Sequence, residues 1–104
     1  MPMTIVVTRD VADRYRGFLA SVMLEIAPGV YVGADLSKGV RQRILTVLSD
    51  WWAGLPGGSV VVVWRDGATS SGIGLTTLGV PPVELVDLDG LLVVRRAIGE
   101  TDVC

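Results

Sequence analysis

The stretch VVVVW at residues 60–64 is the strongest strand signal in the chain. Four β-branched residues followed by an aromatic one are typical of a buried strand, because such side chains pack well on a pleated surface. A glycine-rich turn at 54–59 comes before this stretch, and a polar loop at 66–72 comes after it. We therefore expect a buried strand here, bounded by a turn on each side.

Two amphipathic helices are expected upstream of this strand, because apolar residues recur there three or four positions apart. The first helix is expected over about 11–23 or a little beyond, and its apolar stripe consists of Tyr15, Leu19, Val22, Met23 and Ile26. The second is expected over about 38–53, and its stripe consists of Val40, Ile44, Val47, Leu48 and Trp51. Asp10 and Ser37 stand where the two helices begin, and we expect them to be the N-caps.

Further strands are predicted by short β-branched or alternating runs at 3–8, 30–32, 73–78 and 91–96. Residues 24–27 fit either the last turn of the first helix or a short strand before a turn at Pro28-Gly29. This order predicts an α+β, ferredoxin-like βαββαβ sandwich with an additional late C-terminal strand. Because the two helices cover only one face of such a sheet, we expect the apolar bare face to pack on a second copy, forming a two-fold dimer.

Length and composition are those of one small soluble domain. The chain has 104 residues, half of them apolar, so a core can form without disulfides or a metal. We expect the domain to span 1–98 and a flexible C-terminal tail to span 99–104. There is no histidine and one cysteine, Cys104, which excludes Ser-His-Asp and Cys-His catalysis and an internal disulfide. Without a charged leader or a membrane-length apolar run, a cytoplasmic protein without membrane contact is expected.

The basic residues are concentrated in the first half of the chain, although the net charge is −2. Residues 1–43 carry six Lys/Arg and four Asp/Glu, whereas residues 44–104 carry three and seven. Eight of the nine cations are arginine, the better bidentate ligand for phosphate. GC-rich codon usage explains this preference for arginine equally well.

Two basic groups are candidate nucleic-acid contacts. Arg14 and Arg16 lie in the first turns of the first expected helix, whose N-terminus attracts anions. At about 100° per residue they flank the apolar stripe on opposite sides, so they need not reach the same phosphate. The second group is Lys38, Arg41 and Arg43. For both groups an ordinary solvated helix face is the alternative interpretation.

Asp10 is the one candidate for catalysis or metal binding. An acid at the end of a strand can hold a divalent metal, especially when a dimer axis brings two copies together. The same side chain can serve only as a helix cap, and both roles can coexist. The other acidic group is Glu84, Asp87 and Asp89. It lacks the spacing of an EF-hand loop, and we expect an ordinary turn.

The three tryptophans are candidates for stacking on bases. Trp51 and Trp64 fit core positions in the expected helix and strand, so this pattern leaves only Trp52 free to stack.

Six features occur in the same order as in one known family: Thr8, the motif Arg14-x-Arg16-Gly17, the segment LEIAPGVYVG at 24–33, the strand at 60–64, Gly79 and the segment VDLDGL at 86–91. The chain thereby resembles the small adaptation protein of CRISPR systems, Cas-two, in its type I-E branch. The similarity covers about residues 3–96, and the combination of GVYVG with DLDGL is specific.

The resemblance implies a ferredoxin-like homodimer that takes part in acquiring new spacers. It implies a scaffold that binds double-stranded protospacer DNA and is bound by Cas-one type integrase subunits, which carry the cutting and joining chemistry. Arg14 and Arg16 match positions that touch the DNA backbone, and Lys38 and Arg41 match approximately. The late segment matches a strand used in partner contacts, which gives the candidates Leu91, Leu92, Val93, Val94, Arg95 and Arg96.

One departure bears on catalysis. The wider family is described as a magnesium-dependent endonuclease with an acid at the end of strand one, but the aligned residue here is Arg9. Asp10 comes one residue later, and such a shift turns a side chain to the other face of a sheet. A DNA-binding scaffold is therefore the preferred hypothesis. The alternatives are a metal-dependent nuclease using Asp10 from both subunits and a ferredoxin-like regulatory module that binds a small ligand.

Overall fold

The computed structural model describes residues 3–81 and 83–96. The elements in chain order are β1 Thr4–Arg9, α1 Asp13–Val22, β2 Leu24–Ala27, β3 Val30–Gly33, α2 Lys38–Gly54, β4 Ser59–Arg65, β5 Ile73–Leu78, β6 Val83–Leu88 and β7 Leu91–Arg96. Residues 24–27 are a strand, which decides between the two interpretations of that segment. The tail expected at 99–104 lies outside the described residues.

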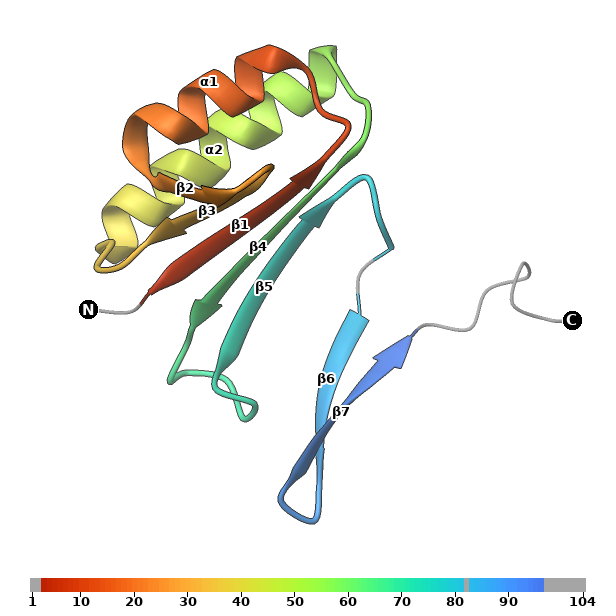
Figure 1. Cartoon of the computed structure of the whole chain (residues 1–104). Coiled ribbons are helices and arrows are strands. Elements are labelled where there is room, and N and C mark those ends of the chain that lie inside the picture. The colour runs from red at the N-terminus through yellow and green to blue at the C-terminus, as the bar shows by residue number, and fades with distance from the viewer. Residues whose placement is uncertain (1–2, 82, 97–104) are drawn as a thin grey trace, which may run out of the picture.

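The main sheet has five strands in the order β2-β3-β1-β4-β5, and every neighbouring pair is antiparallel. Both helices lie on one face of this sheet (Figure 1). The elements from β1 to β4 form the predicted ferredoxin-like βαββαβ unit, and β5 extends the sheet beyond β4. The predicted α+β, ferredoxin-like fold is therefore confirmed. No helix in the described part of the chain is both long and apolar enough to span a bilayer.

The core lies between the helices and the central strands. Val6 of β1 is fully buried, and its register partners are Tyr31 of β3 and Val62 of β4. Leu19 of α1 and Leu48 of α2 close this layer from the helix side. Along β4 burial alternates: Val60 and Val62 are buried, whereas Val61 and Val63 are half-buried on the opposite face. The apolar run at 60–64 therefore has only one of its faces covered within the chain.

The two helices begin differently. The Ser37 Oγ accepts a hydrogen bond from the backbone N–H of Val40 at 3.2 Å, so the predicted cap of α2 is confirmed. The predicted cap of α1 is wrong. Asp10 has a positive φ of 56°, and the helix begins three residues later, after Ala12, which makes no side-chain cap. The left-handed turn at Asp10 redirects the chain, so residues 11 and 12 are needed to bring it over the sheet.

The late part of the chain is a hairpin that projects from the body (Figure 1). Among the described strands β6 and β7 pair only with each other, in a two-stranded antiparallel sheet. The acidic turn expected at Glu84, Asp87 and Asp89 is shorter than predicted, because the first two of these residues lie in β6. The turn is Asp89-Gly90, with φ of 53° and 85°, the two positive values that a tight hairpin turn requires. β6 was not predicted from the sequence, because the two prolines at 81–82 directly before it are residues that interrupt strands.

The difference between the two helix starts can be measured. Ser37→Ala removes the acceptor for the Val40 N–H and is expected to lower the free energy of unfolding by about 1 kcal/mol. Asp10→Asn removes the charge of Asp10 but keeps a residue type that tolerates positive φ, so stability should change by less than about 0.5 kcal/mol. Denaturant titrations of both variants test this. A larger loss for Asp10→Asn than for Ser37→Ala would contradict the observed start of α1.

Candidate nucleic-acid interface

Positive charge is gathered in the helix layer. α1 and α2 together contain five Lys/Arg and two Asp/Glu, a net charge of +3. The whole chain has a net charge of −2, so the remaining residues carry −5. The five cations are Arg14, Arg16, Lys38, Arg41 and Arg43. The fold thus separates a basic helix layer from an otherwise acidic molecule, and a polyanion would be attracted to the helix side.

Arg14 lies on the flank of α1 that faces α2. Its side chain is exposed, and its guanidinium carbon lies 4.8 Å from the centroid of the Trp51 ring on α2. A cation at this distance from an aromatic face is attracted by the ring without losing its charge. Arg14 is therefore held at the surface between the helices.

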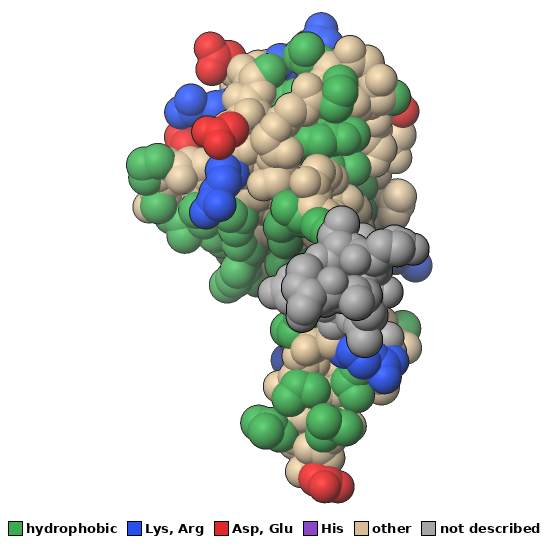
Figure 2. Space-filling view, turned by 90° about the vertical axis from the view of Figure 1, so that its right-hand side faces the viewer, with side chains coloured by type: hydrophobic (Ala, Val, Ile, Leu, Met, Phe, Trp, Pro, Cys, Tyr) green, Lys and Arg blue, Asp and Glu red, His purple; other side chains and the backbone are tan. Residues whose placement is uncertain are grey.

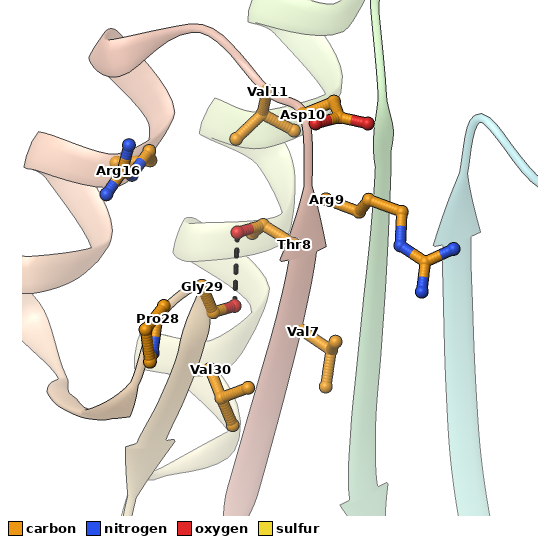
Figure 3. Close-up of a pocket in the computed structure, with 9 residues that line it drawn as sticks. All are labelled: Val7, Thr8, Arg9, Asp10, Val11, Arg16, Pro28, Gly29 and Val30. Carbon is orange, nitrogen blue, oxygen red and sulfur yellow. Dashed lines mark hydrogen bonds between the residues drawn. The ribbon is translucent and has the colours of Figure 1, made fainter.

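Arg16 lies on the opposite flank of α1, as the spacing predicted. It lines a hollow of about 620 Å³ at the end of β1, together with Thr8, Pro28 and Gly29 (Figure 3). The Thr8 side chain and backbone N–H both donate to the Gly29 carbonyl, at 3.1 and 2.7 Å, which fixes the wall of this hollow. An Arg16 terminal nitrogen is 3.8 Å from an Asp13 carboxylate oxygen. Arg16 is thus paired with the carboxylate of Asp13, whereas Arg14 lies over the uncharged ring of Trp51.

Tyr31 is fully buried in β3, and its hydroxyl lies near Arg16 and Glu25 without a hydrogen bond to any residue that the structure describes. Burial raises the pKa of Tyr31, and the Glu25 carboxylate raises it further, while Arg16 opposes both. Glu25 is the register partner of Tyr31 on β2 and also accepts a hydrogen bond from the Gly29 N–H at 3.1 Å. Glu25 therefore brings a carboxylate close to the buried Tyr31 hydroxyl.

The three cations of α2 are not equivalent. Lys38 and Arg43 are exposed, but Arg41 is only 9% exposed, and its guanidinium carbon lies 4.6 Å from the Trp64 ring centroid. The sequence grouped these residues because they are close along one helix. In the folded protein Arg41 instead packs between the helices and the sheet. Its contact there is the ring of Trp64, which lies against Gly74. Arg41 is therefore not presented to an external phosphate as Lys38 and Arg43 are.

A family model described as CRISPR-associated protein (Cas_Cas2CT1978) matches residues 3–93. The chain belongs to this family. It is a CRISPR-associated protein of the Cas2 type, in agreement with the resemblance found in the sequence.

The end of β1 does not provide a metal site within one Cas2-type chain. Among the described residues Asp10 is the single carboxylate that lines the hollow, whereas Arg9 and Arg16 both bring positive charge to it. Arg9 extends away from Arg16, over the neighbouring strand β4 (Figure 3). Among residues 3–81 and 83–96, no group of three or more acidic, Cys or His side chains could hold an ion. One carboxylate beside two guanidinium groups does not fit magnesium, because the ion binds through oxygen ligands and is repelled by positive charge.

The projecting hairpin carries the predicted partner-binding residues. Leu91, Leu92 and Val94 are exposed, Val93 is half-buried and Arg95 is exposed. The side chain of Arg96 lies outside the described residues. Figure 2 shows hydrophobic side chains over this hairpin. A two-stranded hairpin alone is marginally stable in water, and an apolar one exposes surface that another chain can cover.

Local sequence patterns did not predict the aromatic contacts of the basic layer. Spacing assigned Trp51 to the core and left Trp52 free, but both rings pack against Tyr15, with centroid distances of 5.8 and 6.2 Å. The expectation that Trp52 is free is therefore wrong. The contact of Trp51 with Arg14 joins residues far apart in the chain, and no local pattern signals it. The same holds for Tyr31 beneath Arg16.

The raised pKa of Tyr31 predicts a loss of stability in alkali. In the unfolded chain the hydroxyl ionises near its ordinary pKa of 10.0, whereas the folded state resists ionisation. Stability is therefore fully present below pH 10 and falls as the pH rises through the folded pKa. Denaturant titrations across this pH range should show a shallower fall for Tyr31→Phe than for the unchanged protein. Equal slopes would mean that Tyr31 ionises freely in the folded state.

Proposed function

We propose that this Cas2-type protein is a DNA-binding scaffold of the spacer-acquisition complex. In this proposal it forms a two-fold dimer, binds double-stranded protospacer DNA and carries integrase subunits that perform the cutting and joining. The observation that carries the proposal is the net charge of +3 in the helix layer of a chain whose total charge is −2. Membership of a CRISPR-associated family supports a role of the protein in CRISPR adaptation.

The arrangement of the cations suits a DNA backbone. Arg14 and Arg16 lie on opposite flanks of α1, so one helix can contact two different phosphates. Lys38 at the start of α2 and Arg43 one turn further on add exposed charge in the same layer. We leave Arg41 out of the proposed surface because it is buried against Trp64. Contacts of this kind hold DNA in register without reading its bases.

The apolar surfaces support the proposed assembly. The sheet face opposite the helices presents Val7 of β1 and Val61 of β4, which are register partners, with Val63 beside them. Val7 is 40% exposed in the single chain. A second copy on this face would bury it, and the hairpin β6–β7 then remains available for a further contact with the second copy or with an integrase subunit.

The proposal assigns no chemical step to this chain. A phosphodiester cleavage that depends on magnesium needs carboxylates around the ion. The described part of each chain brings one carboxylate and two guanidinium groups to the end of β1. The nuclease alternative would require Asp10 of two subunits to meet. No contact within the single chain favours that arrangement.

Salt dependence of DNA binding tests the proposed surface. Each neutralised phosphate contributes about −0.9 to the slope of log affinity against log salt concentration. Arg14→Ala combined with Arg16→Ala removes up to four contacts from a dimer, so the slope should flatten by up to ~3.6. The titration uses duplex DNA of mixed sequence and the protein assembled with its integrase subunits.

Arg65→Ala is the matched control, because Arg65 is an exposed arginine on β4, outside the helix layer. It should leave the slope unchanged. The loss in the double variant should also be similar for unrelated DNA sequences, as expected for phosphate contacts. An unchanged slope in the double variant would show that α1 is an ordinary solvated helix.

The proposed dimer has a separate test. Val7→Lys puts a charge on the open sheet face, at a position already 40% exposed, so the single chain should still fold. We expect light scattering at micromolar concentration to give a dimer mass for the unchanged protein and a shift toward the monomer for this variant. Val40→Lys, at a 44% exposed position on α2, should leave the dimer intact. A monomer mass for the unchanged protein would contradict the dimer.

A further inference from the structure

We infer that Trp51 is a positioning residue for DNA binding, because its ring holds the Arg14 guanidinium in the orientation that meets a phosphate. This inference rests on the proposed function and deepens it. It assigns a role to a tryptophan that does not itself touch DNA. The ligand class is the phosphate backbone of duplex DNA, and the contact site is the surface between α1 and α2.

The Trp51 ring, which contacts Arg14, is itself packed against core residues. The Trp51 ring meets Tyr15 edge-on, with centroids 5.8 Å apart at 89°, and meets Phe18 at 5.3 Å and 71°. Tyr15 is fully buried, and its hydroxyl donates to the Leu55 carbonyl at 2.8 Å. Edge contacts on two sides fix the plane of the indole. The long Arg14 side chain on the surface of α1 is thereby connected, through the Trp51 ring, to the buried core.

Stacking on a ring prepares an arginine for an anion. A free arginine samples many rotamers, and its affinity for a ligand is reduced by the fraction of time it spends in the competent one. The ring face restricts this sampling but brings no negative charge. A guanidinium donates through N–H groups in its own plane, so contact with its face leaves these donors available for phosphate oxygens. Arg14 therefore keeps both its charge and its donors.

Arg16 shows the contrast within the same helix. Its guanidinium is 3.8 Å from the Asp13 carboxylate. Acidic partners hold a cation in place but compete with phosphate for it. The two arginines are therefore unequal, and Arg14→Ala should weaken DNA binding more than Arg16→Ala does.

A double-variant cycle separates positioning from a general effect on the fold. DNA affinity is measured across a salt series for Trp51→Leu, for Arg14→Ala and for the two combined, in the integrase-bound assembly. A cation–π contact at an exposed site changes an equilibrium constant roughly two- to fivefold. We expect Trp51→Leu to weaken binding by roughly that factor for each Arg14 engaged. In the Arg14→Ala background the same change should have no effect.

The slope of log DNA affinity against log salt concentration is the second measurement. Trp51→Leu leaves Arg14 charged, so the line of log affinity against log salt should move down without changing its slope. Arg14→Ala should change both affinity and slope. Trp51→Phe keeps a ring face and should retain most of the affinity. A merely structural role of Trp51 would not depend on the presence of Arg14.

Trp52→Leu is the matched control. Trp52 is the next residue on α2, packs against the same Tyr15 ring and lies over Gly79. No cation stacks on it among the described residues. Its replacement should have no effect on DNA binding that depends on Arg14, whatever it does to stability.

Two outcomes overturn the inference and are distinguishable. If Arg14→Ala weakens binding but Trp51→Leu causes the same loss with and without Arg14, the positioning role is wrong and the DNA surface stands. If Arg14→Ala changes neither affinity nor slope, the contact proposed for Arg14 is wrong, and the role of Trp51 is lost with it.

Discussion

The structure depends on the burial of β1 between β3 and β4, beneath two helices. Val6 lies at the centre of this arrangement, fully buried and in register with Tyr31 and Val62. The two helices that the structure describes both lie on one face of the five-stranded sheet, and no described helix covers the other face. The apolar side chains of the other face, with the projecting hairpin, are then left for other chains to cover.

The position of both helices on one face of the sheet also explains where the charges lie. The strands are largely apolar, so the outward surfaces of α1 and α2 are where many of the cations can stay in water. Arg14 and Arg16 follow from this, since residues two apart on a helix fall on opposite flanks of the buried stripe. The basic layer is thus a by-product of the same amphipathic pattern that builds the core, and it lies opposite the apolar sheet face.

Within the basic layer, packing gives chemically similar side chains different roles. Arg41 and Arg14 both stack on tryptophans, but Arg41 is 9% exposed and faces Trp64 inside the sandwich, whereas Arg14 stays at the surface on Trp51. Arg16 instead lies near the Asp13 carboxylate, at the hollow beside β1. At the end of β1 itself, Arg9 and Asp10 give mixed charge, which suits neither a metal nor a strong phosphate site.

The sequence by itself determined the elements whose signals are local. Periodicity located both helices and most strands, Ser37 was recognisable as a cap, and the family was identifiable from the GVYVG and DLDGL segments. Tertiary structure alone decided the start of α1, the pairing of β6 with β7, and which ring or acid each arginine meets. The physical reason is range: helix periodicity and capping act over a few residues, whereas the contact of Arg14 with Trp51 and the burial of Tyr31 arise only when distant segments pack together.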